Sequence, residues 1–185
     1  MSLNADQTRA VLSAYQLVMT ASWPTLHPEM IERAPHWASA SAEILEAELQ
    51  SYVQQSSDPR CTVRVFWKIG PRYAFAGCNA HFAQDAGMPA AALLGKDDFD
   101  PKLPWMRQAA KYRDDDEAVF ASETPRLDII ERQQGTTGKI TWVRAGKAPI
   151  RTAQGTIGVF GMYEFLDDAT GRRLFGEQSR RGRQP

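Results

Sequence analysis

Two stretches near the N-terminus carry apolar residues at the three- and four-residue spacing of an amphipathic helix. The positions are Val11, Leu12, Tyr15, Val18 and Met19 in the first stretch and Ile44, Leu45, Leu49, Tyr52 and Val53 in the second. Asn4 and Gln7 have the form of a capping box, and Asp58-Pro59 marks the end of the second helix. We predict a helical extension over residues 1–59. Its apolar stripes must cover the following domain or a partner chain, and we expect a homodimer through these helices.

From residue 62 the period of the apolar residues becomes two, which is typical of a strand buried on one face. Val63, Val65, Trp67 and Ile69 alternate with Thr62, Arg64, Phe66 and Lys68. The following segments predict a second strand over 72–77, short helices over 79–95, a longer helix over 105–123 and strands over 126–132, 140–151 and 156–166. This order predicts an α+β domain over residues 60–168, with an antiparallel sheet and helices on one face. Residues 169–185 are predicted to form a flexible basic tail.

Composition and charge narrow the classes of function. The 185 residues include 22 basic and 22 acidic side chains, so no overall charge attracts the chain to nucleic acid or to an anionic membrane. Residues 1–59 hold seven acidic and two basic side chains, whereas residues 171–185 hold five arginines and one glutamate. The sequence shows no apolar run long enough for a membrane span and no secretory signal. We therefore expect a cytoplasmic protein with neither a membrane nor a nucleic-acid partner.

Several short motifs occur in an order that resembles the PAS domain. They are NAHFAQDAG at 79–87, LLGKDDFD at 93–100, LPW at 103–105, YRDDDEAVF at 112–120 and GKAPIRTAQGTIGVFGMYE at 146–164. The resemblance implies a five-stranded antiparallel sheet and a sensory module in intracellular signal transduction. Such a module binds a small molecule, mediates dimerisation, or does both, and thereby regulates an output domain or signalling protein. The chain departs from the family at the end of the last strand, where Tyr163-Glu164-Phe165 replaces an Asp-Ile-Thr-like triplet.

The resemblance leaves the cofactor unknown. Light-sensing flavin PAS domains need a cysteine directly after the asparagine that corresponds to Asn79, and this chain has Ala80 there, with Cys78 on the other side. Heme PAS domains take an axial histidine from the long helix, and residues 105–123 contain none. A small organic ligand is therefore the leading expectation. The alternatives are a ligand-free protein-interaction adaptor and a redox sensor with a non-covalent flavin.

The candidate ligand site lies where the predicted helices meet the sheet. Aromatic side chains would form its walls, and an amide and two cations would supply polar contacts. The candidate ligand-binding residues are Asn79, Phe82, Trp105, Tyr112, Arg113, Trp142 and Lys147. A cation drawn inward needs a negative partner, which Asp116 or an anionic ligand would supply. For each aromatic residue, packing in the core is the alternative role.

Metal binding and catalysis find no support in the sequence. The acidic side chains at 114–117 point in different directions around a helix, and two cysteines with three histidines lack the spacing of a zinc cluster. No motif of a nucleophilic, phosphate-binding or metalloprotease site is present. We therefore predict no metal site and no enzymatic activity.

Overall fold

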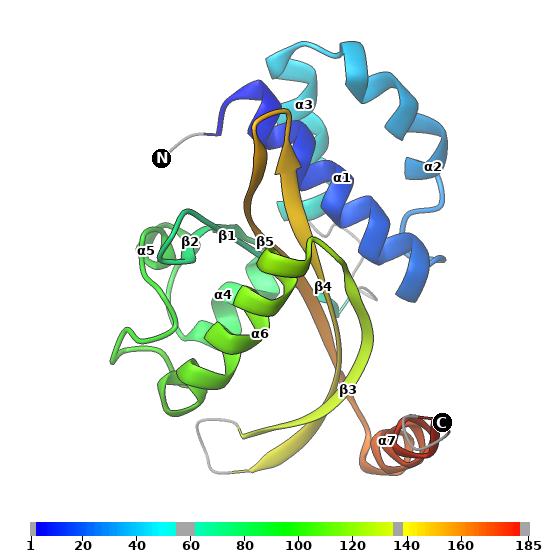
Figure 1. Ribbon diagram of the computed structural model, residues 1–185, viewed down its shortest axis with the longest axis vertical. Coiled ribbons are helices and arrows are strands. Elements are labelled where there is room, and N and C mark those ends of the chain that lie inside the picture. The colour runs from blue at the N-terminus through cyan, green and yellow to red at the C-terminus, as the bar shows by residue number, and fades with distance from the viewer. Residues whose placement is uncertain (1–2, 55–61, 135–138, 182–185) are drawn as a thin grey trace.

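The computed structural model describes residues 3–54, 62–134 and 139–181. Five strands form one antiparallel sheet in the order β2-β1-β5-β4-β3, with β5 at its centre (Figure 1). The strands are β1 Arg64–Ile69, β2 Ala74–Cys78, β3 Arg126–Gln134, β4 Ile140–Thr152 and β5 Gly155–Leu166. The predicted α+β fold with a five-stranded antiparallel sheet is confirmed.

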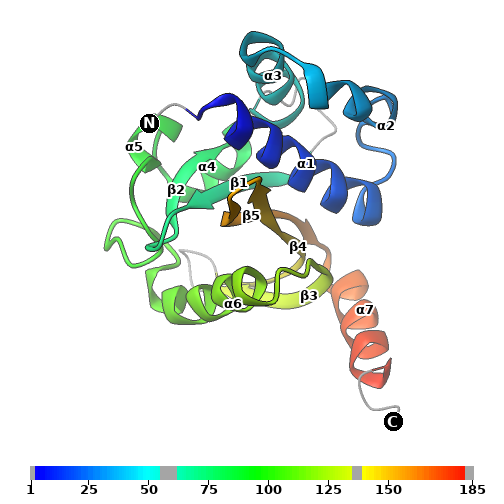
Figure 2. The same ribbon diagram turned by 45° about the horizontal axis from the view of Figure 1, so that its top comes forward.

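The helices that follow β2 cover one face of this sheet (Figure 2). They are α4 Ala80–Ala86, α5 Ala90–Leu93, the 3-10 turn η3 Met106–Gln108 and α6 Ala109–Ser122. Helix α4 begins at Asn79, whose Oδ1 accepts the Phe82 N–H at 3.0 Å, and ends at Gly87, whose φ of 68° suits glycine. These elements confirm the helical segments predicted between the second and third strands.

The N-terminal extension covers the opposite face of the sheet (Figure 2). Helix α1 Ala5–Ser22 begins with the predicted capping box and packs on β4, where Gly146 leaves room for Val18. A Cβ at Gly146 would lie 2.7 Å from Cγ1 of Val18. The whole predicted stripe of α1 is buried in this way by the chain itself. The stripe of α1 is therefore covered within the chain and offers no apolar surface to a partner, whereas the homodimer itself stays a prediction.

Four short segments pack beyond α1 on the same side. They are α2 Met30–Arg33, the 3-10 segment η1 Ala34–Ser39, α3 Ala42–Glu48 and the π-helical segment η2 Leu49–Gln54. Leu45, Leu49 and Val53 are buried as predicted, but Ile44 is 52% exposed, because the inward face of α3 starts one residue later. The predicted end of this segment at Asp58-Pro59 lies outside the described residues.

Residues expected to form a flexible tail instead form helix α7 Asp168–Arg181. Gly171 allows this helix to lie directly on Trp142, because a Cβ at this position would overlap the indole ring. Further along, Gln178 accepts the Ile130 N–H and donates to the Asp128 carbonyl, so it pairs with the free edge of β3. These contacts with β3 and β4 hold the helix in place. In the described part of the chain, no helix is both long and apolar enough to cross a bilayer.

Candidate functional site

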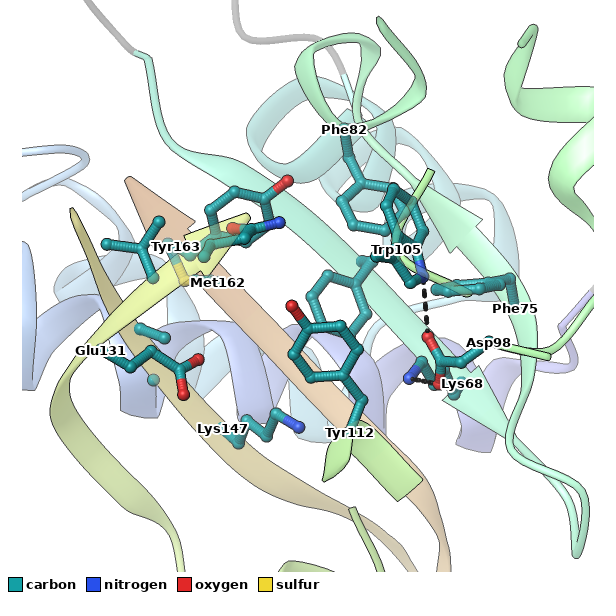
Figure 3. A pocket seen from close by; sticks show the side chains of 15 residues that line it. Lys68, Phe75, Phe82, Asp98, Trp105, Tyr112, Glu131, Lys147, Met162 and Tyr163 are labelled. Carbon is teal, nitrogen blue, oxygen red and sulfur yellow. Dashed lines mark hydrogen bonds and ion pairs between the residues drawn. The ribbon is translucent and has the colours of Figure 1, made fainter. Parts of the chain in front are cut away.

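A cavity of about 60 Å³ lies between the sheet and α6 (Figure 3). Its lining includes the aromatic side chains Phe66, Phe75, Phe82, Trp105 and Tyr112 and the smaller Val143 and Ala145 of β4. By this measure one water molecule needs about 10–15 Å³, so the cavity has room for a few waters. Pockets for drug-sized ligands usually measure about 300–1,000 Å³, so a flavin does not fit the cavity in this conformation.

Aromatic packing explains why the cavity is small. The ring centroid of Phe82 lies 4.8 Å from that of Phe66 and 5.3 Å from that of Trp105. Phe66 in turn lies over Gly161 of β5, where any Cβ would overlap its ring. The space that Gly161 leaves on this face of the sheet is thus filled by a side chain of β1. The aromatic residues form a packed core, and a small void remains where this core meets Lys68, Asp98 and Lys147.

Four charged side chains form a buried chain of ion pairs beside the cavity. Lys68 Nζ binds Asp98 and lies 2.7 Å from Oδ2 of Asp116, whose Oδ1 is 2.5 Å from Nζ of Lys147. The other oxygen of Asp98 accepts the indole N–H of Trp105 at 3.1 Å (Figure 3). Each of these four charged residues is more than nine-tenths buried. The chain of pairs connects β1, β4 and α6 with the loop that carries Asp98.

The neighbouring opposite charges favour the ionised forms of Lys68 and Asp116 despite their burial. Desolvation alone would lower the pKa of Lys68, but the charges of Asp116 and Asp98 outweigh it, so the pKa is raised. Desolvation alone would raise the pKa of Asp116, but Lys147 and Lys68 outweigh it, so the pKa is lowered. Burial also raises the pKa of Tyr112, which therefore keeps its proton and donates to Oε1 of Gln108 at 2.6 Å.

Lys147 supplies the free polar groups on the wall of the cavity. Its ammonium group has three N–H donors, and among the described residues its hydrogen-bond acceptor is Asp116. Figure 3 shows the side chain extending from β4 toward Tyr112. Glu131 and Gln133 of β3 also line the cavity, and the carboxylate of Glu131 is paired with Lys111. The cavity therefore combines aromatic walls with two cations, of which Lys147 has more donors to spare than Lys68.

Four of the seven predicted site residues line this cavity: Phe82, Trp105, Tyr112 and Lys147. The prediction that Asp116 pairs with an inward-facing Lys147 agrees with the ion pair. Whether the four contact a ligand stays a prediction.

The other three predicted residues have their contacts elsewhere. Asn79 caps α4 and bonds to the backbone of β1, including the Val65 N–H at 3.1 Å. Arg113 donates to the Arg72 carbonyl at 2.7 Å, outside the cavity. Trp142 faces α7 and donates to Asp168 at 3.0 Å. Each of them has a structural role that needs no ligand.

Sequence reasoning missed Lys68 and Asp98 as members of the site. Lys68 was assigned to the polar face of β1, but both faces of this strand are buried, because α1 and α3 pack near one face and α4 and α6 near the other. The available signal was Phe66, an aromatic residue on the supposedly exposed face. Asp98 has no local signal of its role, because Lys68 lies 30 residues away in the sequence.

Comparison with solved structures places this geometry in a known class of fold. VqmA of Vibrio cholerae in a complex with ligand and DNA is similar, with 20% identity, a TM-score of 0.54 and coverage of 71% of this chain and 54% of that one. A phage VqmA–DPO complex has 15% identity, a TM-score of 0.54 and coverage of 74% and 59%. A PAS domain from Colwellia psychrerythraea has 11% identity, a TM-score of 0.48 and coverage of 68% and 98%. The strand order β2-β1-β5-β4-β3 and the helices between β2 and β3 give this chain a PAS-like fold, as the resemblance predicted.

These findings correct one expectation from the sequence. We expected no nucleic-acid partner because the overall charge is balanced, yet VqmA, which shares the fold, occurs in a complex with DNA. Net charge says nothing about a local surface or about a neighbouring domain, so the exclusion does not hold. The chain spans little more than half the length of the VqmA chains. A scan against protein-family models finds no match, and neither does a search of the curated proteins.

Proposed function

We propose that this chain is a sensory module whose small-molecule ligand binds in the cavity between the sheet and α6. The observation that carries the proposal is the ammonium group of Lys147, which is buried beside a cavity and has donors to spare. Buried donors without acceptors are costly, so water or a ligand in the cavity accepts them. The cytoplasmic location expected from the sequence stays a prediction.

The buried ion pairs provide a route from ligand to protein. A ligand that accepts one of the spare donors of Lys147 draws the ammonium group toward the cavity and so changes its geometry with Asp116. Asp116 belongs to α6 and Lys147 to β4, so a change in this pair alters how the helix sits on the sheet. Ligand binding shifts the population of two arrangements only if the ligand interacts differently with each, and the altered position of Lys147 supplies such a difference.

The regulated output is proposed from the comparisons alone. The VqmA structures are named for a receptor bound to ligand and to DNA, and this chain corresponds to about half of that receptor. We therefore include control of DNA binding among the outputs that a ligand in this cavity would regulate.

A second candidate is a protein-interaction adaptor that needs no ligand. The small volume of the cavity and the packed rings of Phe66, Phe82 and Trp105 favour it. On this alternative, water molecules accept the spare donors of Lys147, and the ion pairs serve only to hold α6 on the sheet.

Native mass spectrometry and an NMR fragment screen distinguish the two candidates. The protein is compared with Ala145→Leu, which fills the cavity from β4, and with Ala92→Leu, the same change at an exposed position of α5. A sensory module retains or binds small molecules, and binding is lost in Ala145→Leu but kept in Ala92→Leu. If no molecule binds the unmodified protein, or if Ala145→Leu binds equally well while still folded, the adaptor is the better explanation.

A further inference from the structure

The charges around the cavity cancel one another. Lys68 and Lys147 balance Asp98 and Asp116, and all four belong to one continuous chain of ion pairs. At the β3 side, the negative charge of Glu131 is paired with Lys111. The site is therefore electrically neutral before any ligand enters.

This balance restricts what the cavity accepts. Both oxygens of Asp116 already accept a lysine, and the two oxygens of Asp98 accept Lys68 and Trp105. An additional anion or cation would lie in a poorly hydrated space without a counter-charge of its own. An uncompensated buried charge is strongly unfavourable, whereas a neutral polar group costs little once it is hydrogen-bonded.

We propose that the ligand of this cavity carries no net charge and presents a hydrogen-bond acceptor, such as a carbonyl oxygen or a ring nitrogen, to Nζ of Lys147. The proposal rests on the function proposed above and adds the chemical class of the ligand. An anion, which the inward-facing cations suggested from the sequence, is disfavoured because Asp98 and Asp116 already neutralise both lysines.

The size of the cavity adds a second restriction. Benzene occupies an engineered apolar cavity of about 150 Å³, which is more than twice the volume found here. A ligand that contains a six-membered ring must therefore displace a side chain to enter. The side chain that we expect to be displaced is Tyr112. It lies on α6, and its hydroxyl bonds to Gln108, a half-buried residue of the adjoining turn η3.

Three probes of nearly equal shape test this preference for an uncharged ligand, the charge rule, in the full chain. They are acetamide, which is neutral, acetate, which is an anion, and acetamidinium, which is a cation. Their dissociation constants are measured at neutral pH by NMR titration, with the Ala145 and Lys147 amide signals as reporters of the cavity. We expect acetamide to bind at least about tenfold more tightly than either ion, because each ion adds an uncompensated charge.

Two variants should change the preference in opposite directions. Lys147→Met leaves the cluster with one net negative charge and should favour acetamidinium, whereas Asp98→Asn leaves one net positive charge and should favour acetate. Arg113→Gln also changes the charge of the chain but lies outside the cavity, so its preference should match that of the unmodified protein. If either buried variant fails to fold, the ranking in the unmodified protein still decides.

The outcomes distinguish a failure of the charge rule from a failure of the proposed sensory function. If acetate or acetamidinium binds the unmodified protein as tightly as acetamide, the charge rule is wrong while the sensory function stands. If folded variants keep the acetamide preference, charge balance does not set the specificity. If none of the probes binds and the fragment screen is also empty, the sensory function fails and the charge rule with it.

Discussion

Replacing Asp116 by asparagine removes one charge from the centre of the buried cluster and leaves the shape of the side chain almost unchanged. Asp116 is fully buried, and its two oxygens hold Lys68 and Lys147 at 2.7 and 2.5 Å. The variant leaves Lys68 paired with Asp98, whereas Lys147 loses the acidic partner that it has among the described residues. Breaking a buried ion pair costs about 3–5 kcal/mol, and we expect the lower end because asparagine still offers one acceptor.

Urea denaturation measures this loss directly. With a slope of about 2 kcal/mol per molar urea, a loss of about 3 kcal/mol lowers the midpoint by about 1.5 M. Asp115→Asn is the matched control, because Asp115 is the neighbouring residue and pairs with Lys111 and Arg126 at a partly exposed position. Such pairs contribute about 0–1 kcal/mol, so the control midpoint should fall much less. Equal midpoints for the two variants would refute the importance assigned to the buried cluster.

The same comparison has a defined pH dependence. The pKa of Asp116 in the folded chain is below its ordinary value of 3.8, so its contribution to stability is complete above that pH and is lost as the pH falls through the folded value. The difference between the unmodified protein and Asp116→Asn should therefore be constant near neutral pH and shrink in acid. A difference that stays the same down to pH values well below 3.8 would contradict the assigned ionisation.

Three further substitutions test the packing around the site. Gly161→Ala forces the ring of Phe66 to move and should destabilise the chain by about 1–3 kcal/mol in thermal or urea denaturation, and a neutral result would show that the ring adapts freely. Gly171→Ala should displace α7 from Trp142, which tryptophan fluorescence and hydrogen exchange of the helix would report; unchanged exchange would mean that the contact does not hold α7. Asn79→Ala removes the cap of α4, one bond to Val65 of β1 and one to Val63 directly before that strand, and should cost about 1–3 kcal/mol while leaving probe binding in the cavity unchanged. Lost binding in a folded variant would restore Asn79 to the ligand site.

The sequence alone determined the order of the elements. Helical spacing, strand alternation and turn residues are local signals, so the capping box at Asn4, the helix after Asn79 and the five strands were all predictable. The same signals determined that α1 has one apolar face. They did not determine what covers that face, because a stripe looks the same whether it packs on its own sheet or on another chain.

The composition of the site was decided by the tertiary structure. The partners of Lys68 lie 30 and 48 residues away in sequence, and the partner of Lys147 lies 31 residues away. An alternating pattern shows that β1 has two faces but not that helices cover both, so it assigned Lys68 to solvent. Packing of α6 on the sheet excludes water from these lysines and aspartates, and this exclusion makes their exact balance of charge matter for stability and for the choice of ligand.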